Sequence, residues 1–196
     1  MATLPIFLEL RDRPCLVIGA GEVAFRKASA LVAGGAKVTV VSPRLSAGIE
    51  RLVRLGKVAW RPHRFQPNDL KGVELAVAAT SDQPVNERAA REARARSVWI
   101  NVVDQPELCS FIFPSVLRRG RLSLAISTEG ASPALAKWIR RDLERRYGPE
   151  FKTLLDEAAR LRPRVKQAVP GAGRRKRLFE KALRAYLKVL KAGGMR

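Results

Sequence analysis

The chain has few of the residues on which metal centres and disulfide frameworks depend. Its 196 residues include one histidine and two cysteines, so neither a disulfide framework nor a stable metal site is expected. No apolar run approaches the roughly 20 residues that a membrane span needs. The first residues lack a basic stretch followed by an apolar one, so no secretory signal is expected. These absences lead us to expect a cytoplasmic protein that does not enter a membrane.

Acidic residues are scarce relative to basic ones. The chain has 38 Lys and Arg against 18 Asp and Glu, a formal net charge of +20, and most of the excess lies after residue 136. Such a field attracts polyanions, including nucleic acid, acidic lipid and small polycarboxylates. The basic run Arg174–Arg177 is typical of a nucleic-acid patch, but no aromatic residues are interleaved with it. Nucleic acid is therefore the less favoured partner, although charge alone does not choose among the three.

Two glycines near the start of the chain, Gly19 and Gly21, belong to a recognisable motif. The short apolar run Cys15–Gly19 leads into the pattern G-x-G-x-x-A, which ends at Ala24, and Glu22–Ala33 has helical spacing of apolar residues. Gly19 permits a tight turn, Gly21 lets a pyrophosphate approach the backbone, and a helix N-terminus offers N–H groups to phosphate. The pattern predicts a dinucleotide site. The alternative is a tight turn in an α/β domain that binds nothing there.

Strand and helix patterns alternate over residues 1–113. The expected elements after the first helix are, in order, Lys37–Val41, Ser46–Leu55, Val58–Trp60, Val73–Ala79, Pro84–Arg96 and Trp99–Val103. Pro62–Asp69 is expected to be a loop, with His63 at the surface. Alternation of this kind predicts an α/β fold with a Rossmann-type parallel sheet and right-handed crossovers.

The pattern changes after residue 113. We expect a small α+β dimerisation segment over 114–148, in which strands Phe111–Val116 and Leu122–Ser127 flank a basic turn and Ser132 caps a helix ending near Tyr147. Two strands and a helix make a poor independent domain, which favours a homodimer. We expect residues 149–196 to form a C-terminal helical segment, with a first helix that ends before Pro163.

Polar residues at the predicted strand ends are candidates for the site. Thr80 follows the fourth strand, Asp82 is a candidate helix cap, and Asp104 follows the fifth strand. Ligands bind at this edge of a parallel sheet. The second strand is followed by Ser42, Pro43 and Arg44, with no acidic residue to bind an adenosine ribose. An arginine here suits a ribose 2′-phosphate, so chemistry alone leaves NAD and NADP open.

Four stretches together resemble a known family. They are, in chain order, LPIFLELRDRPCLVIGAGEVAFRKASALVAGGAKVTVVSP, AATSDQPVN, NVVDQPELCSFIFPS and STEGASPALAK. In order and spacing they resemble the precorrin-2 dehydrogenase family, which includes the dehydrogenase part of sirohaem synthases. The resemblance covers essentially the whole chain. It implies NAD-dependent oxidation of precorrin-2, a polycarboxylate tetrapyrrole, to sirohydrochlorin.

The resemblance also assigns residues. Asp104 matches the catalytic aspartate of the family, and a homodimer is implied. Fe²⁺ insertion, which some members carry out, is left open. Substrate-binding positions would be Thr128, Gly130 and Ser132, in a loop that a plain helix cap explains almost as well. The implied cofactor-binding positions are Gly19, Gly21, Glu22, Val23, Pro43, Arg44, Thr80, Asn101 and Val102.

Two alternatives remain. The missing acidic residue after the second strand leaves room for a different dinucleotide-dependent oxidoreductase. The positive charge alone favours a non-enzymatic protein that senses NAD or binds nucleic acid. Asp104 at a strand end argues against the non-enzymatic protein, because a sensor needs no base there.

Overall fold

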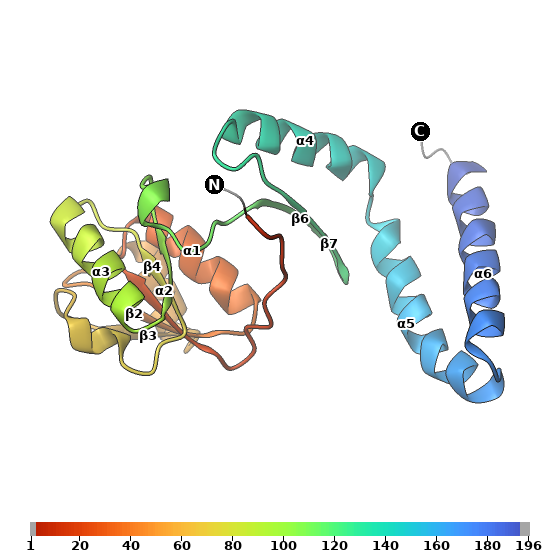
Figure 1. The fold of residues 1–196 in the computed structure, drawn as a ribbon, viewed down its shortest axis with the longest axis horizontal. Coiled ribbons are helices and arrows are strands. Elements are labelled where there is room, and N and C mark those ends of the chain that lie inside the picture. Colours follow the sequence, from red (N-terminus) through yellow and green to blue (C-terminus); the bar gives the residue numbers. More distant parts are fainter. Residues whose placement is uncertain (1–2, 193–196) are drawn as a thin grey trace. The chain divides into compact units, whose positions relative to one another are not determined.

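The computed structural model describes residues 3–192, with side chains up to residue 188 (Figure 1). The chain divides into two compact units, and the division falls between Phe113 and Pro114. Each unit is described by itself. The first two residues of the predicted segment 1–113 and the last four of the segment 149–196 lie outside the described residues.

The first unit is built on a five-stranded parallel sheet in the order β3-β2-β1-β4-β5. The strands are β1 (Pro14–Ile18), β2 (Lys37–Val41), β3 (Val58–Arg61), β4 (Leu75–Ala78) and β5 (Trp99–Val102). In the central register, Leu16 lies opposite Thr39 on one side and Ala76 on the other. The strand order reverses between β1 and β4, which leaves a crevice at the carboxyl edge of the sheet. The predicted α/β class with a Rossmann-type sheet is confirmed.

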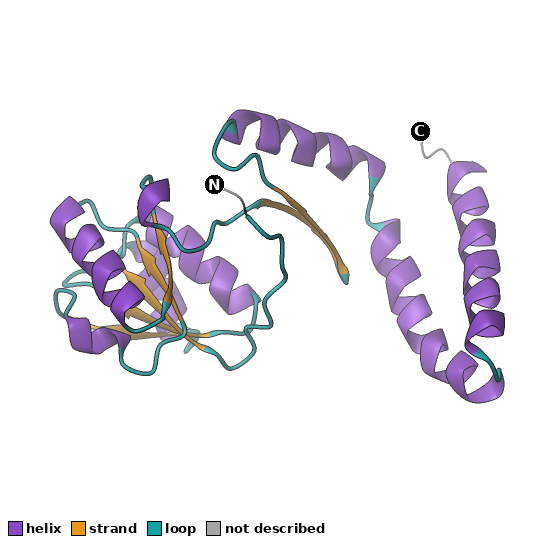
Figure 2. Ribbon diagram, in the orientation of Figure 1, coloured by secondary structure: helices purple, strands orange, loops and turns teal. Residues whose placement is uncertain are grey.

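Helices cover both faces of this sheet (Figure 2). They are α1 (Glu22–Ala33), α2 (Ala47–Arg54), α3 (Gln83–Ala95) and the short 3-10 helices η1 (Pro67–Leu70) and η2 (Pro106–Leu108). Successive β1 side chains point to opposite faces: Cys15 and Val17 pack in the cluster that includes α1, and Leu16 and Ile18 in the cluster that includes α3. Each fully buried side chain of this size contributes about 1.5–3 kcal/mol.

The predicted strand Phe111–Val116 is wrong at its start, because the segment before Pro114 is tied to β5. The Asn101 side-chain amide donates to the Phe111 carbonyl over 3.0 Å. The Ser110 N–H donates to the Ile100 carbonyl over 2.8 Å, and the Phe111 and Phe113 rings pack with centroids 5.2 Å apart. The bond to the Phe111 carbonyl occupies a backbone acceptor that a strand starting at this residue would need.

The second unit begins with an antiparallel hairpin of β6 (Ser115–Arg119) and β7 (Leu122–Ile126). The predicted basic turn is therefore shorter than expected, because Arg118 and Arg119 belong to the strand and Gly120, with a φ of +58°, closes the turn. Ser132 caps α4 (Pro133–Arg146), as predicted, by accepting the Leu135 N–H over 3.2 Å.

Two helices complete the second unit, α5 (Glu150–Ala168) and α6 (Ala172–Ala192). The prediction that the first of them ends before Pro163 is wrong, because α5 continues through this residue. A proline inside a helix removes one N–H donor and crowds one carbonyl, and the remaining hydrogen bonds of a 19-residue helix outweigh that loss. No described helix is apolar enough over sufficient length to cross a membrane.

Candidate functional site

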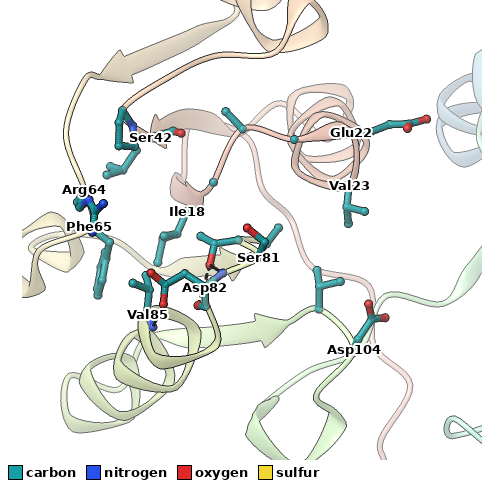
Figure 3. A pocket seen from close by; sticks show the side chains of 18 residues that line it. Ile18, Glu22, Val23, Ser42, Arg64, Phe65, Ser81, Asp82, Val85 and Asp104 are labelled. Atoms are coloured by element: carbon teal, nitrogen blue, oxygen red, sulfur yellow. Dashed lines mark hydrogen bonds between the residues drawn. The ribbon is translucent and has the colours of Figure 1, made fainter.

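A pocket of about 540 Å³ opens at the carboxyl edge of the sheet in the first unit. Its walls come from the segments that follow β1, β2, β4 and β5 and from the loop after β3 (Figure 3). This volume suits a small-molecule ligand. The pocket lies where the strand order reverses, which is the ligand crevice of such sheets.

The glycine turn forms the middle of the pocket. Gly19 has a φ of +101°, and a Cβ atom there would lie 2.5 Å from the Ala79 carbonyl oxygen, so no other residue fits. Gly21 precedes α1, and no atom lies within 4 Å of where its Cβ would be. The free N–H groups of the α1 N-terminus and the bare backbone at Gly21 therefore fit a pyrophosphate. Glu22 and Val23 also line the pocket.

Hydrogen bonds fix the wall that follows β4. The Thr80 hydroxyl donates to the Asn86 side-chain oxygen over 2.8 Å, and the Asn86 amide donates back to the Thr80 carbonyl over 3.0 Å. Asp82 caps α3 by accepting the Val85 N–H over 3.3 Å. Asn86 is buried, so this bonding satisfies its amide as well as holding Thr80 at the pocket.

Asp104 lies at one end of the pocket, close to Val23 and away from Ser42 (Figure 3). It is exposed and has a φ of +59°. Val103 lines the pocket beside it. The Asp104 carboxylate can therefore contact a ligand whose far end extends beyond the glycine turn.

Asn101 and Val102 do not line the pocket. The Asn101 amide bonds the Phe111 carbonyl, and the Val102 N–H lies 3.1 Å from the Cys109 sulfur. Burial raises the pKa of the Cys109 thiol above its ordinary value. These contacts secure the loop that follows Asp104, and the role of Asn101 and Val102 in binding a cofactor stays a prediction.

Lys27, which the sequence did not single out, lies near the same loop. Its ammonium group is 3.8 Å from the centroid of the Phe113 ring, and the side chain is half-buried. Burial, with a smaller contribution from Arg26, lowers the pKa of Lys27 to about 8, and attraction from Cys109 and Asp104 opposes this shift. A cation is therefore held where it attracts the Asp104 carboxylate.

The other end of the pocket is formed by Ser42, Pro43, Arg64 and Phe65 (Figure 3). Pro43 is where the sequence predicted it, whereas Arg44 does not line the pocket. Arg64 and Phe65 were missed because their loop has no periodic pattern and no motif. The only sequence signal was their position after a strand of the sheet.

Three family models match consecutive parts of the chain. They are described as putative NAD(P)-binding over residues 6–115, sirohaem biosynthesis protein central over 119–146 and sirohaem synthase dimerisation region over 150–195. The dimerisation model thus covers the segment for which the sequence predicted helices alone.

Individual proteins agree with these matches. The siroheme synthases of Methylobacillus flagellatus and Methylococcus capsulatus are 45% and 44% identical to this chain over 91% and 93% of its length. The chain spans 38% and 39% of those relatives. The solved structure of SirC, a precorrin-2 dehydrogenase, has a TM-score of 0.78 and 30% identity and covers 91% of this chain and 88% of SirC.

The chain belongs to the precorrin-2 dehydrogenase family. The predicted membership is confirmed, and the glycine turn belongs to an NAD(P)-binding domain. Membership favours an enzyme of sirohaem biosynthesis over both alternatives drawn from the sequence.

The predicted substrate loop of this family member lies in the second unit. Thr128 accepts the Ser132 N–H through its hydroxyl oxygen over 3.2 Å and the Ala131 N–H through its carbonyl over 2.8 Å. Gly130 has a φ of +87°, which the turn requires. These bonds account for a capping loop before α4, and substrate binding by Thr128, Gly130 and Ser132 stays a prediction.

The described residues contain no cluster of side chains that could bind a metal ion. Over residues 3–192, no group of three or more His, Cys, Asp or Glu side chains could hold a metal ion. Fe²⁺ as a substrate needs no resident site, because a tetrapyrrole supplies its own nitrogens. Iron insertion stays a prediction.

Proposed function

We propose that this chain catalyses the NAD-dependent oxidation of precorrin-2 to sirohydrochlorin. The proposal rests on one observation: the Asp104 carboxylate lies at one end of a pocket that the glycine turn Gly19–Val23 lines. Family membership and the likeness to SirC support the same reaction.

The chemistry matches the pocket. Precorrin-2 loses two hydrogens as one hydride and one proton, and NAD, when bound, supplies the hydride acceptor. Asp104 takes the proton, or holds the ring, at the strand end beyond the glycine turn. Lys27 places a positive charge near the Asp104 carboxylate. Gly19 and Gly21 position the cofactor and leave the choice of substrate to the rest of the site.

We also propose a homodimer and a polycarboxylate substrate. The match of residues 150–195 to a sirohaem synthase dimerisation region supports self-association. The excess of Lys and Arg supports attraction of a substrate that carries acetate and propionate arms.

An anaerobic assay with precorrin-2 and NAD tests the reaction through the change in absorption spectrum. Asp104→Asn should lower turnover by at least about 100-fold, because general base catalysis contributes that much. Its affinity for NAD, measured by calorimetry, should not change. Near-normal turnover by the variant would contradict the role of Asp104, and NAD binding without turnover by the unmodified protein would contradict the reaction.

A further inference from the structure

The end of the pocket away from Asp104 lacks the acidic residue that many dinucleotide folds have after the second strand. In dinucleotide folds the segment after the second strand binds the adenosine ribose, and an acidic residue there repels a 2′-phosphate. Here β2 is followed by Ser42, Pro43 and Arg44, so no carboxylate is present. Across from this segment, Arg64 and Phe65 complete the wall (Figure 3). The charged side chains that line the pocket are Glu22, Arg64, Asp82 and Asp104, of which Arg64 is the positive one. The Asp82 carboxylate, which Figure 3 draws beside Val85, caps α3.

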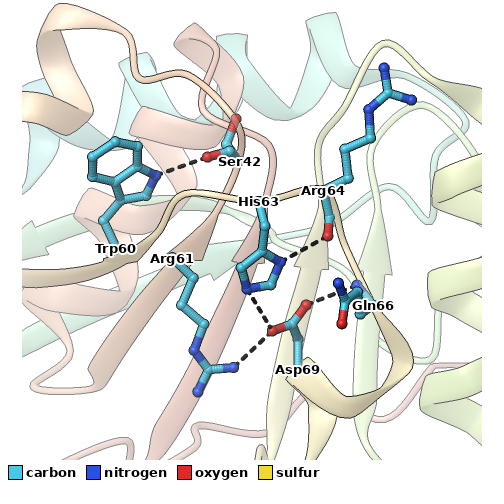
Figure 4. A network of polar contacts seen from close by, with 7 residues as sticks. All are labelled: Ser42, Trp60, Arg61, His63, Arg64, Gln66 and Asp69. Atoms are coloured by element: carbon cyan, nitrogen blue, oxygen red, sulfur yellow. Dashed lines mark hydrogen bonds and ion pairs between the residues drawn. The ribbon is translucent and has the colours of Figure 1, made fainter.

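The loop that carries Arg64 is held in place by a buried carboxylate (Figure 4). Asp69 is 4% exposed. It accepts hydrogen bonds from the Arg61 guanidinium over 2.9 Å and from the Gln66 N–H over 2.8 Å, and the His63 ring lies 3.6 Å away. A buried carboxylate with several partners is costly to rearrange. The backbone is therefore fixed on both sides of Arg64.

Further contacts fix the loop directly at Arg64. A His63 ring nitrogen lies 2.9 Å from the Arg64 carbonyl oxygen, and Phe65 is buried in the core. Across the pocket, the Trp60 indole donates to the Ser42 carbonyl over 2.9 Å. Hydrogen bonds therefore fix the backbone on both sides of this pocket end, at Ser42 and at Arg64, while the Arg64 side chain is exposed.

The arginines near this end of the pocket, Arg44, Arg61 and Arg64, differ in whether they form an ion pair within the chain. Asp69 pairs with Arg61. Within residues 3–188, neither Arg44 nor Arg64 forms an ion pair. Of these two, Arg64 lines the pocket. A planar guanidinium with unused N–H donors is the side chain best suited to a phosphate.

We propose that Arg64 forms a phosphate subsite for the 2′ position of the adenosine ribose, so that the chain binds NADP⁺ as well as NAD⁺. The inference rests on the proposed function, in which the pocket takes a nicotinamide dinucleotide. In this proposal Arg64 determines which dinucleotide the pocket prefers. The oxidation of precorrin-2 itself does not require Arg64.

The test uses the adenosine half of the cofactor and isothermal calorimetry on the full chain. Because the protein carries a formal charge of +20, any added phosphate strengthens binding, and the probes must have equal charge. Adenosine 2′,5′-bisphosphate and adenosine 3′,5′-bisphosphate meet this condition. We expect the 2′ isomer to bind about tenfold more tightly, as a charge-assisted hydrogen bond at a partly exposed site allows. Arg64→Ala should abolish that preference.

Two further variants make the assignment specific. Arg54→Ala removes one exposed charge from α2 and should keep the preference, which controls for net charge. Arg44→Ala should also keep it, since Arg44 does not line the pocket. Equal binding of the two isomers by the unmodified protein overturns the subsite, and loss of the preference in Arg44→Ala but not Arg64→Ala overturns the choice of residue. NAD⁺ binding measured in the same series tests the dinucleotide pocket separately, so the subsite can fail while the proposed function stands.

Discussion

The two units of the chain differ in how much of their apolar surface they bury themselves. In the first unit, helices on both faces of the sheet enclose two clusters of buried side chains. Among the described residues of the second unit, the buried hydrophobic side chains are Leu117 and Ala136, and α5 has none. Leu135 and Trp138, three residues apart on α4, are 48% and 61% exposed. The sheet core of the first unit is enclosed within one chain, although Leu4 and Phe7 before β1 are 82% and 74% exposed. The second unit buries little by itself and presents apolar surface that a second copy can cover.

The strongest test of close packing in the first unit is Gly19→Ala. We expect the free energy of unfolding to fall by about 3 kcal/mol, because the added methyl meets the Ala79 carbonyl and the backbone φ is positive. Urea denaturation followed by circular dichroism measures this change. Gly21→Ala is the matched control: its methyl meets no atom within 4 Å, so stability should fall only by the weaker N-cap preference of alanine, about 0.5–1 kcal/mol, while NAD affinity falls. Equal losses of stability in the two variants would contradict the packing at the turn.

The second unit is tested by Trp138→Glu. A charge in a covered apolar contact should weaken self-association by at least about tenfold, as measured by analytical ultracentrifugation. NAD binding should be unchanged, since the pocket lies in the first unit. Trp99→Glu serves as the control, because Trp99 is 44% exposed in the first unit and its replacement should leave association as it was. If Trp138→Glu associates like the unmodified chain, this face of α4 does not form the contact.

A smaller effect concerns Lys27, a cation that the first unit desolvates. Its pKa falls from 10.5 to about 8 in the folded chain, so charging it opposes folding below pH 8. This cost disappears as the pH rises from 8 towards 10.5, where the folded state has already lost the proton. Lys27→Met should therefore be more stable than the unmodified protein at pH 7 by about 1 kcal/mol.

Denaturation at two pH values separates this effect from simple packing. The gain from Lys27→Met should shrink between pH 7 and pH 10, and Lys71→Met, which replaces an exposed lysine of the same unit, should show no gain at either pH. A gain of equal size at both pH values would mean that burial of the charge is not its cause.

The fold was predictable where local patterns repeat. The apolar runs around Val17 and Val77 and the glycine at position 19 define strands and a turn without reference to distant residues. The errors arose where distant contacts decide. Asn101 holds the Phe111 carbonyl and so prevents a strand from starting there, and α5 extends past Pro163 despite the missing N–H donor.

The site was predictable for similar reasons, and only in part. Gly19, Thr80 and Asp104 lie within two residues of the ends of β1, β4 and β5, so the carboxyl edge of the sheet brings them together. Arg64 lies in a loop whose course is set by a buried carboxylate five residues later in the chain. Nothing in a run such as Pro62–Asp69 reveals which of its charged residues will be buried and which will face a pocket.

The left-handed backbone at Asp104 limits which replacements can report on its chemistry. At a φ of +59°, asparagine and glycine are accommodated, whereas alanine adds about 1 kcal/mol or more of backbone strain. Asp104→Ala would strain the backbone after β5 and also remove the carboxylate, so a loss of turnover in this variant would have two causes. Natural or designed variation at position 104 should therefore be confined largely to aspartate, asparagine and glycine even where the reaction is not required. Asparagine is the replacement that separates the shape of this turn from its charge.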